Sequence, residues 1–328
     1  MLAGLHAACW RAAVSALDRR HRQRLQILIF HRVLPEPDPL FPGEVTAARF
    51  DRLLRLLAVG FQVLPLGQAL ALRRAGRLPP RALSITFDDG YADNARIALP
   101  ILRRHGLAAT FFVATGFLDG GRMFNDTVIE TIRRTTADRI DLSDWALGER
   151  SLHGAADRRL AIDALLPLVK YRPLEQRHDF LRRLARLAGE PDLPDDLMMR
   201  SDEVQALHAA GMEIGGHTVN HPILRLLPDR EAEAEISLGR ECLQSLIDAP
   251  VELFAYPNGR PNEDYDARHA AMARKLGFVG AVSTAAGVVM PDADPYQLPR
   301  FTPWDDGELR WMGRLLHARL RGTHAAMA

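Results

Sequence analysis

The stretch Thr86-Phe87-Asp88-Asp89-Gly90 places two adjacent carboxylates at the point where a predicted strand ends. Residues 82–85 form a mostly apolar run, which is typical of a buried strand, and Gly90 ends that run. Two neighbouring carboxylates can divide their work, because one can bind a cation while the other removes a proton from water. The alternative is a simple turn, in which Asp88 accepts a hydrogen bond and Gly90 has a positive φ.

A second cluster, His217-Thr218-Val219-Asn220-His221, supplies ligands that such a cation needs. The two imidazoles are four residues apart, so they share a face if the segment is helical. Pro222 disfavours helical geometry at His221, which favours a turn there. Surface histidines are the alternative interpretation of this motif taken alone. Together with Asp89, the two histidines would form a three-ligand site with an open position for water, as catalytic metal sites do.

The two motifs together resemble the NodB-homology polysaccharide deacetylases, carbohydrate esterase family 4. The resemblance covers residues 25–118 and 200–302, with an unmatched stretch between them. It implies that Asp88 is the general base. It also implies that Asp89, His217 and His221 bind a divalent metal, usually Zn²⁺, with Co²⁺ or Ni²⁺ as alternatives.

The segment Ile29-Phe30-His31-Arg32-Val33 is similar to one variant of this family, the circularly permuted poly-N-acetylglucosamine deacetylases. In that variant a Tyr/Phe-His motif precedes the Asp-Asp pair. The resemblance implies that His31 is the general acid. A core or capping histidine at the tip of a strand is the alternative.

The segment Tyr256-Pro257-Asn258-Gly259 resembles the third motif of the family, and a turn explains it equally well. The resemblance makes Tyr256 a catalytic candidate, because the backbone N–H at this position helps to hold an oxyanion, and Asn258 a candidate for substrate binding. The usual arginine of this motif is missing. Arg300, also assigned to the substrate-binding group, could replace it by pairing with Asp88; a surface ion pair is the alternative.

Residues 119–200 interrupt the alternation of predicted strands and helices. They are rich in Arg, Asp, Leu and Ala at helical spacing, and no convincing strand occurs from residue 119 until residue 212, so a helical insertion is predicted. Asn125 and Asp126 lie where the insertion opens, close behind a strand end, and are candidates for lining a sugar cleft. A helix N-cap formed by either residue is the simpler alternative.

The predicted strands number seven, which favours an α/β fold of the distorted (β/α)7 barrel type. They begin near residues 25, 83, 109, 212, 252, 278 and 297. Two parts of the chain are expected: an amphipathic N-terminal helix at 1–24, and the barrel at 25–328 with its insertion. The helix is expected to pack on the barrel, with a membrane-surface helix as the alternative.

The composition of the chain bears on its partners and on its location in the cell. The chain has 328 residues, is 47% hydrophobic and carries a formal net charge of +1, so no nucleic-acid partner is predicted. Two cysteines are too few for a disulfide framework and fit a reducing compartment or no redox role. Without a recognisable signal or apolar span, a cytoplasmic location is expected, with peripheral association at the inner membrane face as an alternative. No obligate protein partner is inferred.

These features predict a metal-dependent deacetylase that hydrolyses N-acetyl groups of amino sugars, in a polysaccharide or its lipid-linked precursor. Exopolysaccharide biosynthesis is the expected setting. O-acetyl and formamide substrates stay open. Two other functions compete with this one: a glycoside hydrolase that uses Asp88 or Asp89 with a distant carboxylate, and a barrel that binds carbohydrate without catalysis.

Overall fold

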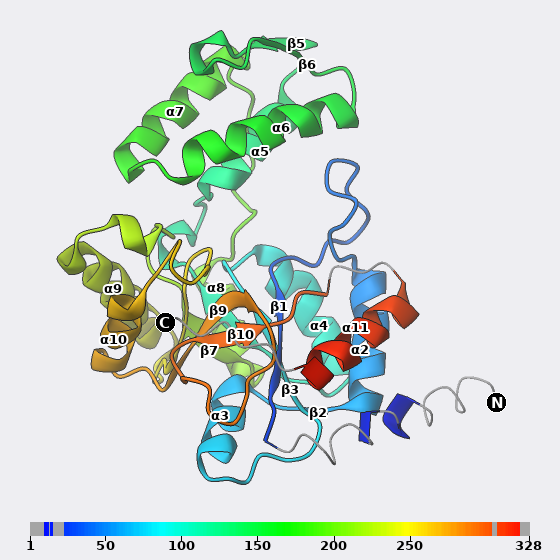
Figure 1. Ribbon diagram of the computed structural model, residues 1–328. Helices are drawn as coiled ribbons and strands as arrows, with labels where there is room; N and C mark the ends of the chain where they lie inside the picture. Colours follow the sequence, from blue (N-terminus) through cyan, green and yellow to red (C-terminus); the bar gives the residue numbers. More distant parts are fainter. Residues whose placement is uncertain (1–9, 13, 16–22, 304–306, 322–328) are drawn as a thin grey trace.

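Seven parallel strands form a nearly closed barrel in the computed structural model, which describes residues 10–12, 14–15, 23–303 and 307–321 (Figure 1). Around the barrel the strands are β1 (Gln26–Phe30), β3 (Ala82–Phe87), β4 (Thr110–Val113), β7 (Glu213–Gly216), β8 (Leu253–Ala255), β9 (Gly280–Ala286) and β10 (Leu298–Arg300). Phe301 closes the barrel against β1, since its N–H donates to Ile27 O at 2.8 Å and its carbonyl accepts from Ile29 N at 3.1 Å. The predicted α/β class and distorted (β/α)7 barrel are confirmed.

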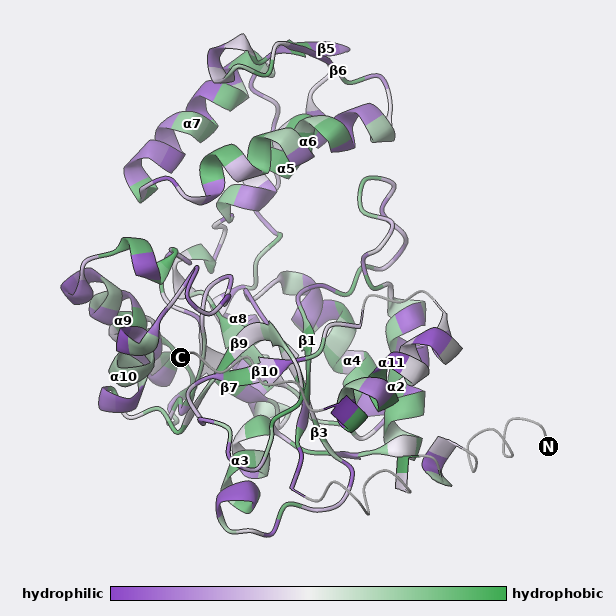
Figure 2. Ribbon diagram, in the orientation of Figure 1, coloured by the Kyte–Doolittle hydropathy of each residue, from purple (hydrophilic) through white to green (hydrophobic). Residues whose placement is uncertain are grey.

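The strands are buried along their whole length in β1, β3 and β4, as expected for a parallel sheet that is covered on both faces. Inside this core Phe87 stacks on Phe111, with ring centroids 4.8 Å apart, and on Phe30 at 5.4 Å. Figure 2 shows hydrophobic colour along the central strands and mixed colour along the outer helices. A short strand that the sequence analysis did not predict, β2 (Gln62–Val63), extends the sheet beside β3.

Helices follow most of the strands and cover the barrel. They are α2 (Ala47–Gly60), α3 (Leu66–Arg74), α4 (Leu99–Arg104), α8 (Ser201–Ala209), α9 (Asp229–Ile247), α10 (Ala267–Lys275) and α11 (Glu308–Arg321). A π-helical segment, Asn94–Ala98, precedes α4, and Pro100 stands in the first turn of α4. Residues 92–104 are helical throughout, so Pro100 lies inside a continuous helical run, close behind its π-helical segment.

The insertion forms a second group of elements, coloured green at the top of Figure 1. It contains α5 (Phe124–Arg134), α6 (Ala155–Lys170), α7 (Leu174–Leu187) and a hairpin of β5 (Arg139–Asp141) with β6 (Glu149–Ser151). The expectation that no strand lies between residues 119 and 212 was therefore wrong. Each of these strands has three residues, and only Ile140 is buried in β5, so there is no run long enough to show an alternating pattern.

The core of the insertion is distinct from the core of the barrel. Val128, Ile140, Leu152, Leu165 and Leu184 are buried together in it, whereas the barrel residues form other clusters. The insertion therefore packs mainly on itself, and it also contacts the loop after β1, where Leu40 joins its core and Asp38 accepts hydrogen bonds from Arg133.

The predicted N-terminal helix lies mostly outside the described residues. Within them, Trp10 and Val14 are buried, and the Trp10 indole N–H donates to Leu56 O at 2.9 Å, which packs this segment against α2. Among the described residues, no helix combines the length and the apolar character that crossing a membrane requires.

Candidate metal and catalytic centre

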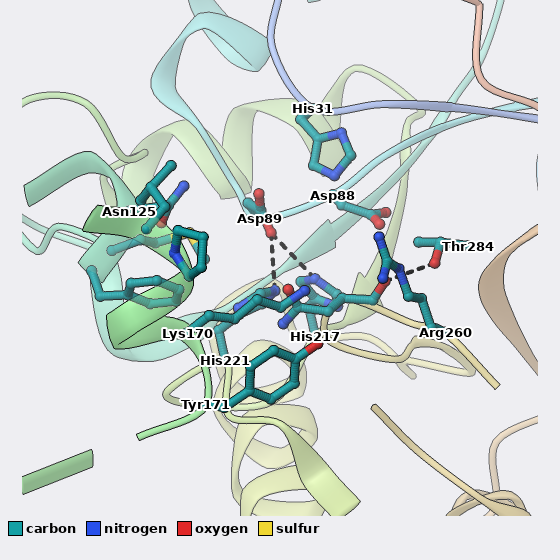
Figure 3. Close-up of a pocket in the computed structure, with 15 residues that line it drawn as sticks. His31, Asp88, Asp89, Asn125, Lys170, Tyr171, His217, His221, Arg260 and Thr284 are labelled. Atoms are coloured by element: carbon teal, nitrogen blue, oxygen red, sulfur yellow. Dashed lines mark hydrogen bonds and ion pairs between the residues drawn. The ribbon is translucent and has the colours of Figure 1, made fainter. Parts of the chain in front are cut away.

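Asp89, His217 and His221 converge at the carboxyl ends of two barrel strands. Asp89 follows β3, and both histidines follow β7. The Oδ1 atom of Asp89 lies 3.3 Å from His217 Nε2 and 3.4 Å from His221 Nε2, and all three side chains are buried (Figure 3). One ligand atom from each residue lies within 4.8 Å of the others. The carboxyl ends of barrel strands are where this class of fold places its chemistry.

The histidine segment is a loop, and its backbone is unusual. Thr218 and His221 have φ values of 67° and 49°, and Asp89 has 75°. Residues other than glycine seldom adopt this region, and such strain is found most often at functional sites. The prediction of a turn at His221 agrees with this geometry. The left-handed residues bend the loop so that both imidazoles reach Asp89 without a helix.

Glu235 on α9 fixes this loop. Its carboxylate accepts hydrogen bonds from the backbone N–H of Val219 at 3.0 Å, from the N–H of Asn220 at 2.8 Å and from the Asn220 amide at 2.7 Å. The helix approaches closely because residue 239 is glycine, and a Cβ there would lie 2.8 Å from backbone atoms of Thr218. The loop is therefore held by one charged side chain and by close packing.

The hydrogen bonds and charges set the protonation states of the three side chains. His217 Nδ1 donates to Ala255 O at 2.7 Å, so Nδ1 carries a proton. Burial alone would lower the pKa of His217, but the hydrogen bond to Asp89 and the charges of Asp88 and Asp89 raise it, so a bound cation would take the place of a proton on Nε2. Burial lowers the pKa of His221 to about 3, which keeps this imidazole neutral. Burial alone would raise the pKa of Asp89, but the hydrogen bond to His217 and the nearby imidazoles hold it below its ordinary value.

This donor set fits a divalent transition metal. Two imidazole nitrogens and one carboxylate oxygen are the donors of many catalytic zinc sites, which keep a further position for water or substrate. The Ala255 carbonyl orients His217 as such sites require. The residues predicted to bind the metal are thus the ones that the structure brings together.

Asp88 stands beside the candidate metal ligands, but its side chain pairs with Arg300. Arg300 donates to both of its oxygens, at 2.7 Å and 2.6 Å, and both side chains are buried. Arg300 also donates to Thr86 Oγ1 at 3.1 Å and to Ser283 O at 2.8 Å. Burial alone would raise the pKa of Asp88, but the charge and hydrogen bonds of Arg300 keep it below its ordinary value.

Arg300 therefore pairs with the predicted base, and the interpretation as a surface ion pair was wrong. Its assignment to substrate binding also needs correction, since Arg300 is buried behind Asp88 and does not line the pocket. A charge this well enclosed needs its partner, because an unpaired buried charge is unfavourable.

A pocket of about 480 Å³ opens over this centre. Asp88, Asp89, His217 and His221 line it, together with the exposed side chain of His31. Asn125 and Asn258, both predicted to contact substrate, also lie in its wall. Figure 3 shows His31 on one side of Asp89 and residues of the insertion on the other.

Tyr256 is not part of this pocket, contrary to its predicted catalytic role. Its backbone N–H donates to Val282 O at 3.2 Å, so this N–H continues the pairing of β8 with β9 and is not free to hold an oxyanion. Its hydroxyl donates to Tyr296 O at 2.8 Å, and its ring stacks on Tyr265. The side chain is fully buried and supports the barrel.

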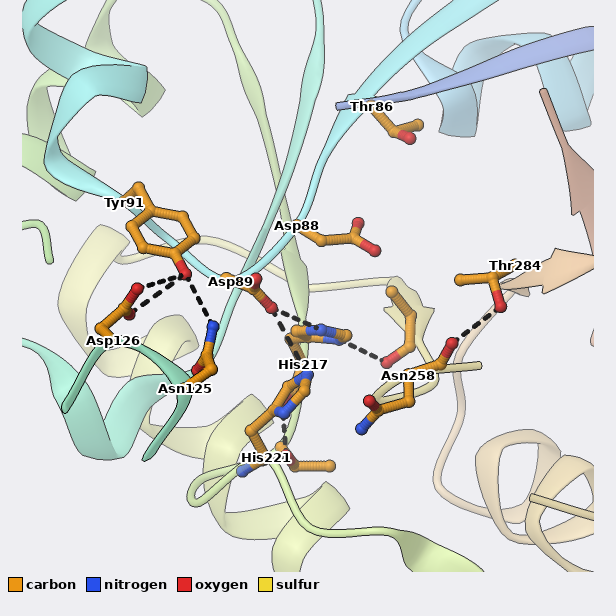
Figure 4. Close-up of polar contacts among 12 residues, drawn as sticks. Thr86, Asp88, Asp89, Tyr91, Asn125, Asp126, His217, His221, Asn258 and Thr284 are labelled. Atoms are coloured by element: carbon orange, nitrogen blue, oxygen red, sulfur yellow. Dashed lines mark hydrogen bonds and ion pairs between the residues drawn. The ribbon is translucent and has the colours of Figure 1, made fainter. Parts of the chain in front are cut away.

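Asp126 and Asn125 are not helix caps, because Met123 occupies the N-cap position of α5 and both residues lie inside the helix. Asp126 is buried and accepts a hydrogen bond from the Tyr91 hydroxyl at 3.1 Å, while the Asn125 amide donates to the same hydroxyl at 3.3 Å (Figure 4). Burial raises the pKa of Asp126 to about 7. Asp126 lines a smaller neighbouring cavity of about 190 Å³, not the main pocket.

Four other polar residues of the pocket were not predicted: Lys170, Tyr171, Arg260 and Thr284. Arg260 directly follows Asn258 and Gly259, so the same turn motif could have indicated it. Lys170 and Tyr171 stand at the end of α6 in the insertion. No local pattern marks them, because their position depends on how the insertion sits on the barrel.

The fold and the site define a (β/α)7 barrel with a candidate metal centre at the carboxyl ends of its strands. A family model for polysaccharide deacetylases matches residues 75–153 and 174–281, more than half of the chain. The chain belongs to the polysaccharide deacetylase family, whose members are hydrolases that act on the amide bonds of N-acetyl groups. The predicted family is confirmed.

Similar proteins include YxkH of Bacillus subtilis strain 168, assigned by name to the polysaccharide deacetylases. It is 21% identical over 242 residues, which are 74% of this chain and 58% of that protein. Among solved structures, the deacetylase PplD of Streptococcus pyogenes in complex with acetate is 17% identical, with a TM-score of 0.60 over 89% of this chain and 98% of that chain. IcaB of Ammonifex degensii is 19% identical, with a TM-score of 0.58 over 92% of this chain and 98% of that chain. At these identities the similarity concerns the fold.

Proposed function

We propose that this protein is a metal-dependent hydrolase that removes N-acetyl groups from amino sugars of a glycan. The observation that carries the proposal is that the two neighbouring aspartates have different partners. Asp89 faces two imidazoles at metal-binding distance, whereas Asp88 is clamped by Arg300 and keeps its edge toward the same pocket. A cation site and an ionised base side by side are what amide hydrolysis by activated water requires.

In this proposal each residue has one task. A divalent ion, most simply Zn²⁺, held by Asp89, His217 and His221 would supply Lewis acidity at the acetyl carbonyl oxygen. Asp88 accepts the proton of the attacking water, and Arg300 keeps Asp88 ionised and fixed in place. His31, exposed in the pocket wall, donates a proton to the departing amine. The C–N bond breaks, and acetate and the free amino sugar leave.

The pocket supports a sugar-sized substrate. Its volume of about 480 Å³ lies in the usual range for small-molecule sites, and its wall offers amide, hydroxyl and cationic groups. PplD, which shares this fold, was solved with acetate, the acid that deacetylation releases.

The direct test is acetate release from N-acetylglucosamine oligomers by purified protein, first stripped of metal and then restored with zinc or cobalt. We expect release that depends on added metal. Release of reducing ends that persists in chelator would support a glycoside hydrolase instead. Absence of acetate with every metal, despite about one bound equivalent, would contradict deacetylation of this sugar.

A further inference from the structure

An apolar groove of about 610 Å³ adjoins the catalytic pocket. One wall is the turn between α6 and α7 with the start of α7, and the other is loop 219–228 with α9. Among the described residues, seven large hydrophobic side chains are exposed, and four of them line this groove: Tyr171, Leu174, Leu226 and Leu238. Exposed apolar side chains that gather in one place usually mark a binding surface.

The groove is continuous with the catalytic pocket. Tyr171 lines both, and Figure 3 shows its ring at the edge of the pocket in front of His221. Val219 and Asn220, which separate the two metal-ligand histidines in the sequence, form part of the groove wall. A molecule held in the pocket can therefore extend into the groove.

Three cationic side chains lie where the catalytic pocket meets the groove. Lys170 lines the pocket, and Arg172 and Arg177 line the groove. Arg177 is only 4% exposed, yet it donates only to backbone carbonyls, to Arg172 O at 3.0 Å and Lys170 O at 2.7 Å. In the part of the chain that the structure describes, no carboxylate lies within ion-pair distance of these three side chains.

Two carboxylates line the groove, Glu231 and Glu235, and in the described part of the chain neither forms an ion pair with these cations. The oxygens of Glu235 accept hydrogen bonds from Val219 and Asn220 instead. The charges of Asp264 and Glu263 act on Lys170 without a direct contact. The guanidinium of Arg177 packs on the Phe124 ring, 4.6 Å from its centroid, and burial lowers the pKa of Arg177 to about 10. Buried cations left in this state favour an anionic ligand, and the planar guanidinium of arginine matches the oxygens of a phosphate group.

We propose that the natural substrate is an N-acetylated amino sugar joined through a phosphate to a lipid chain. The sugar occupies the catalytic pocket, the phosphate lies among Lys170, Arg172 and Arg177, and the chain covers the leucines of the groove. This proposal rests on the proposed function, since it names the substrate of the same site. The lipid is the chosen occupant because a sugar polymer would not cover the apolar wall.

The test compares two soluble esters of N-acetylglucosamine 1-phosphate, one with farnesol and one with methanol. We expect kcat/KM for acetate release to be higher for the farnesyl ester by about tenfold or more, because the chain buries apolar area in the groove. The double variant Leu226→Asp/Leu238→Asp should bring this ratio toward one. The matched control is Leu160→Asp, which replaces a leucine of α6 that is 67% exposed outside the groove and should keep the wild-type ratio.

The phosphate is tested with the farnesyl glycoside that lacks it. The wild-type enzyme should prefer the phosphate compound, and Arg177→Gln should lose that preference. If Arg177→Gln does not fold, Arg172→Gln, whose half-buried side chain donates to Leu168 O, repeats the test.

The outcomes separate the two proposals. Acetate release from neither ester, nor from oligomers, would refute the proposed function itself. Equal kcat/KM for the farnesyl and methyl esters would refute the lipid substrate alone. An unchanged ratio in Leu226→Asp/Leu238→Asp would refute the groove as its site. A dimer in sedimentation that this double variant dissociates would assign the groove to a second copy of the chain.

Discussion

Asp88 and Asp89 are neighbours in the sequence, but their surroundings give them different chemistry. Both oxygens of Asp88 accept from Arg300, which is itself anchored to Thr86 and Ser283. Asp89 lies against two imidazoles, and no arginine among the described residues forms an ion pair with it. These surroundings support the proposal that Asp88 is the base and that Asp89 binds the cation.

Replacement of Asp88 by Asn should abolish turnover and leave metal binding intact. The amide cannot accept the proton of water, and loss of a general base lowers the rate by about 10²- to 10⁴-fold. His217→Ala should lose both metal and turnover, because it removes a ligand. Acetate release and metal content of the purified variants check both statements. An Asp88→Asn enzyme with wild-type turnover would exclude Asp88 as the base.

Asp126 should make the protein less stable as the pH rises. Burial raises its folded-state pKa to about 7, so the folded state holds this proton more tightly than the unfolded chain does. The free energy of unfolding is then largest below the unfolded pKa, near 4, and falls as the pH rises toward 7. In Asp126→Asn the amide oxygen still accepts a hydrogen bond from the Tyr91 hydroxyl. Because this side chain does not ionise, its contribution to the fall in stability with pH disappears.

Urea unfolding at pH 5 and pH 8, in chelator, measures the effect. From pH 5 to pH 8, the free energy of unfolding of the wild-type protein should fall by roughly 1 to 3 kcal/mol more than that of Asp126→Asn. Asp192→Asn changes an exposed carboxylate and should follow the wild-type protein. Parallel pH dependence of wild type and Asp126→Asn would show that Asp126 is ionised at both pH values.

At the scale of elements, α9 organises the metal centre without supplying a ligand. Glu235 holds the loop between the two histidines, and Gly239 lets the helix approach that loop. Groups that orient metal ligands in this way tune the affinity of the site.

Replacement of Glu235 by Ala should weaken metal binding by about 10- to 100-fold, because the loop loses three hydrogen bonds to one carboxylate. Competition with a chromophoric chelator gives the dissociation constant. Glu241→Ala, an exposed change on the same helix, controls for effects on α9 itself. If Glu235→Ala binds metal as tightly as Glu241→Ala does, the loop holds its shape without Glu235.

The elements also show where sequence reasoning succeeds. The strands that carry His31, Asp88 and His217 are short buried runs that end at polar residues, so their position and the resulting convergence could be predicted. The hairpin β5 and β6 could not, since its strands are short and mostly exposed. The bidentate contact of Arg300 and the position of Lys170 depend on contacts between distant segments, which no local pattern records.

At the scale of the whole molecule, a bound metal would join the ends of β3 and β7 and stabilise the barrel. A ligand whose free concentration is 100 times its dissociation constant adds about 2.7 kcal/mol to the free energy of unfolding. Zinc should therefore raise the Tm of the metal-stripped wild-type protein by several degrees. It should leave His217→Ala unchanged, and His153→Ala, at an exposed histidine of the insertion, should respond as the wild type does. A Tm that zinc does not move would contradict metal binding at this centre.

The separate core of the insertion suggests how such a barrel can acquire new substrates. Residues 124–187 pack mainly around their own apolar side chains, with Leu40 of the loop after β1 added, and Asn125, Lys170 and Tyr171 reach the catalytic pocket from them. Evolution or design can therefore exchange this segment as a module. The aspartates and histidines of the barrel would keep the same hydrolytic reaction, while the exchanged segment would decide which glycan the enzyme accepts.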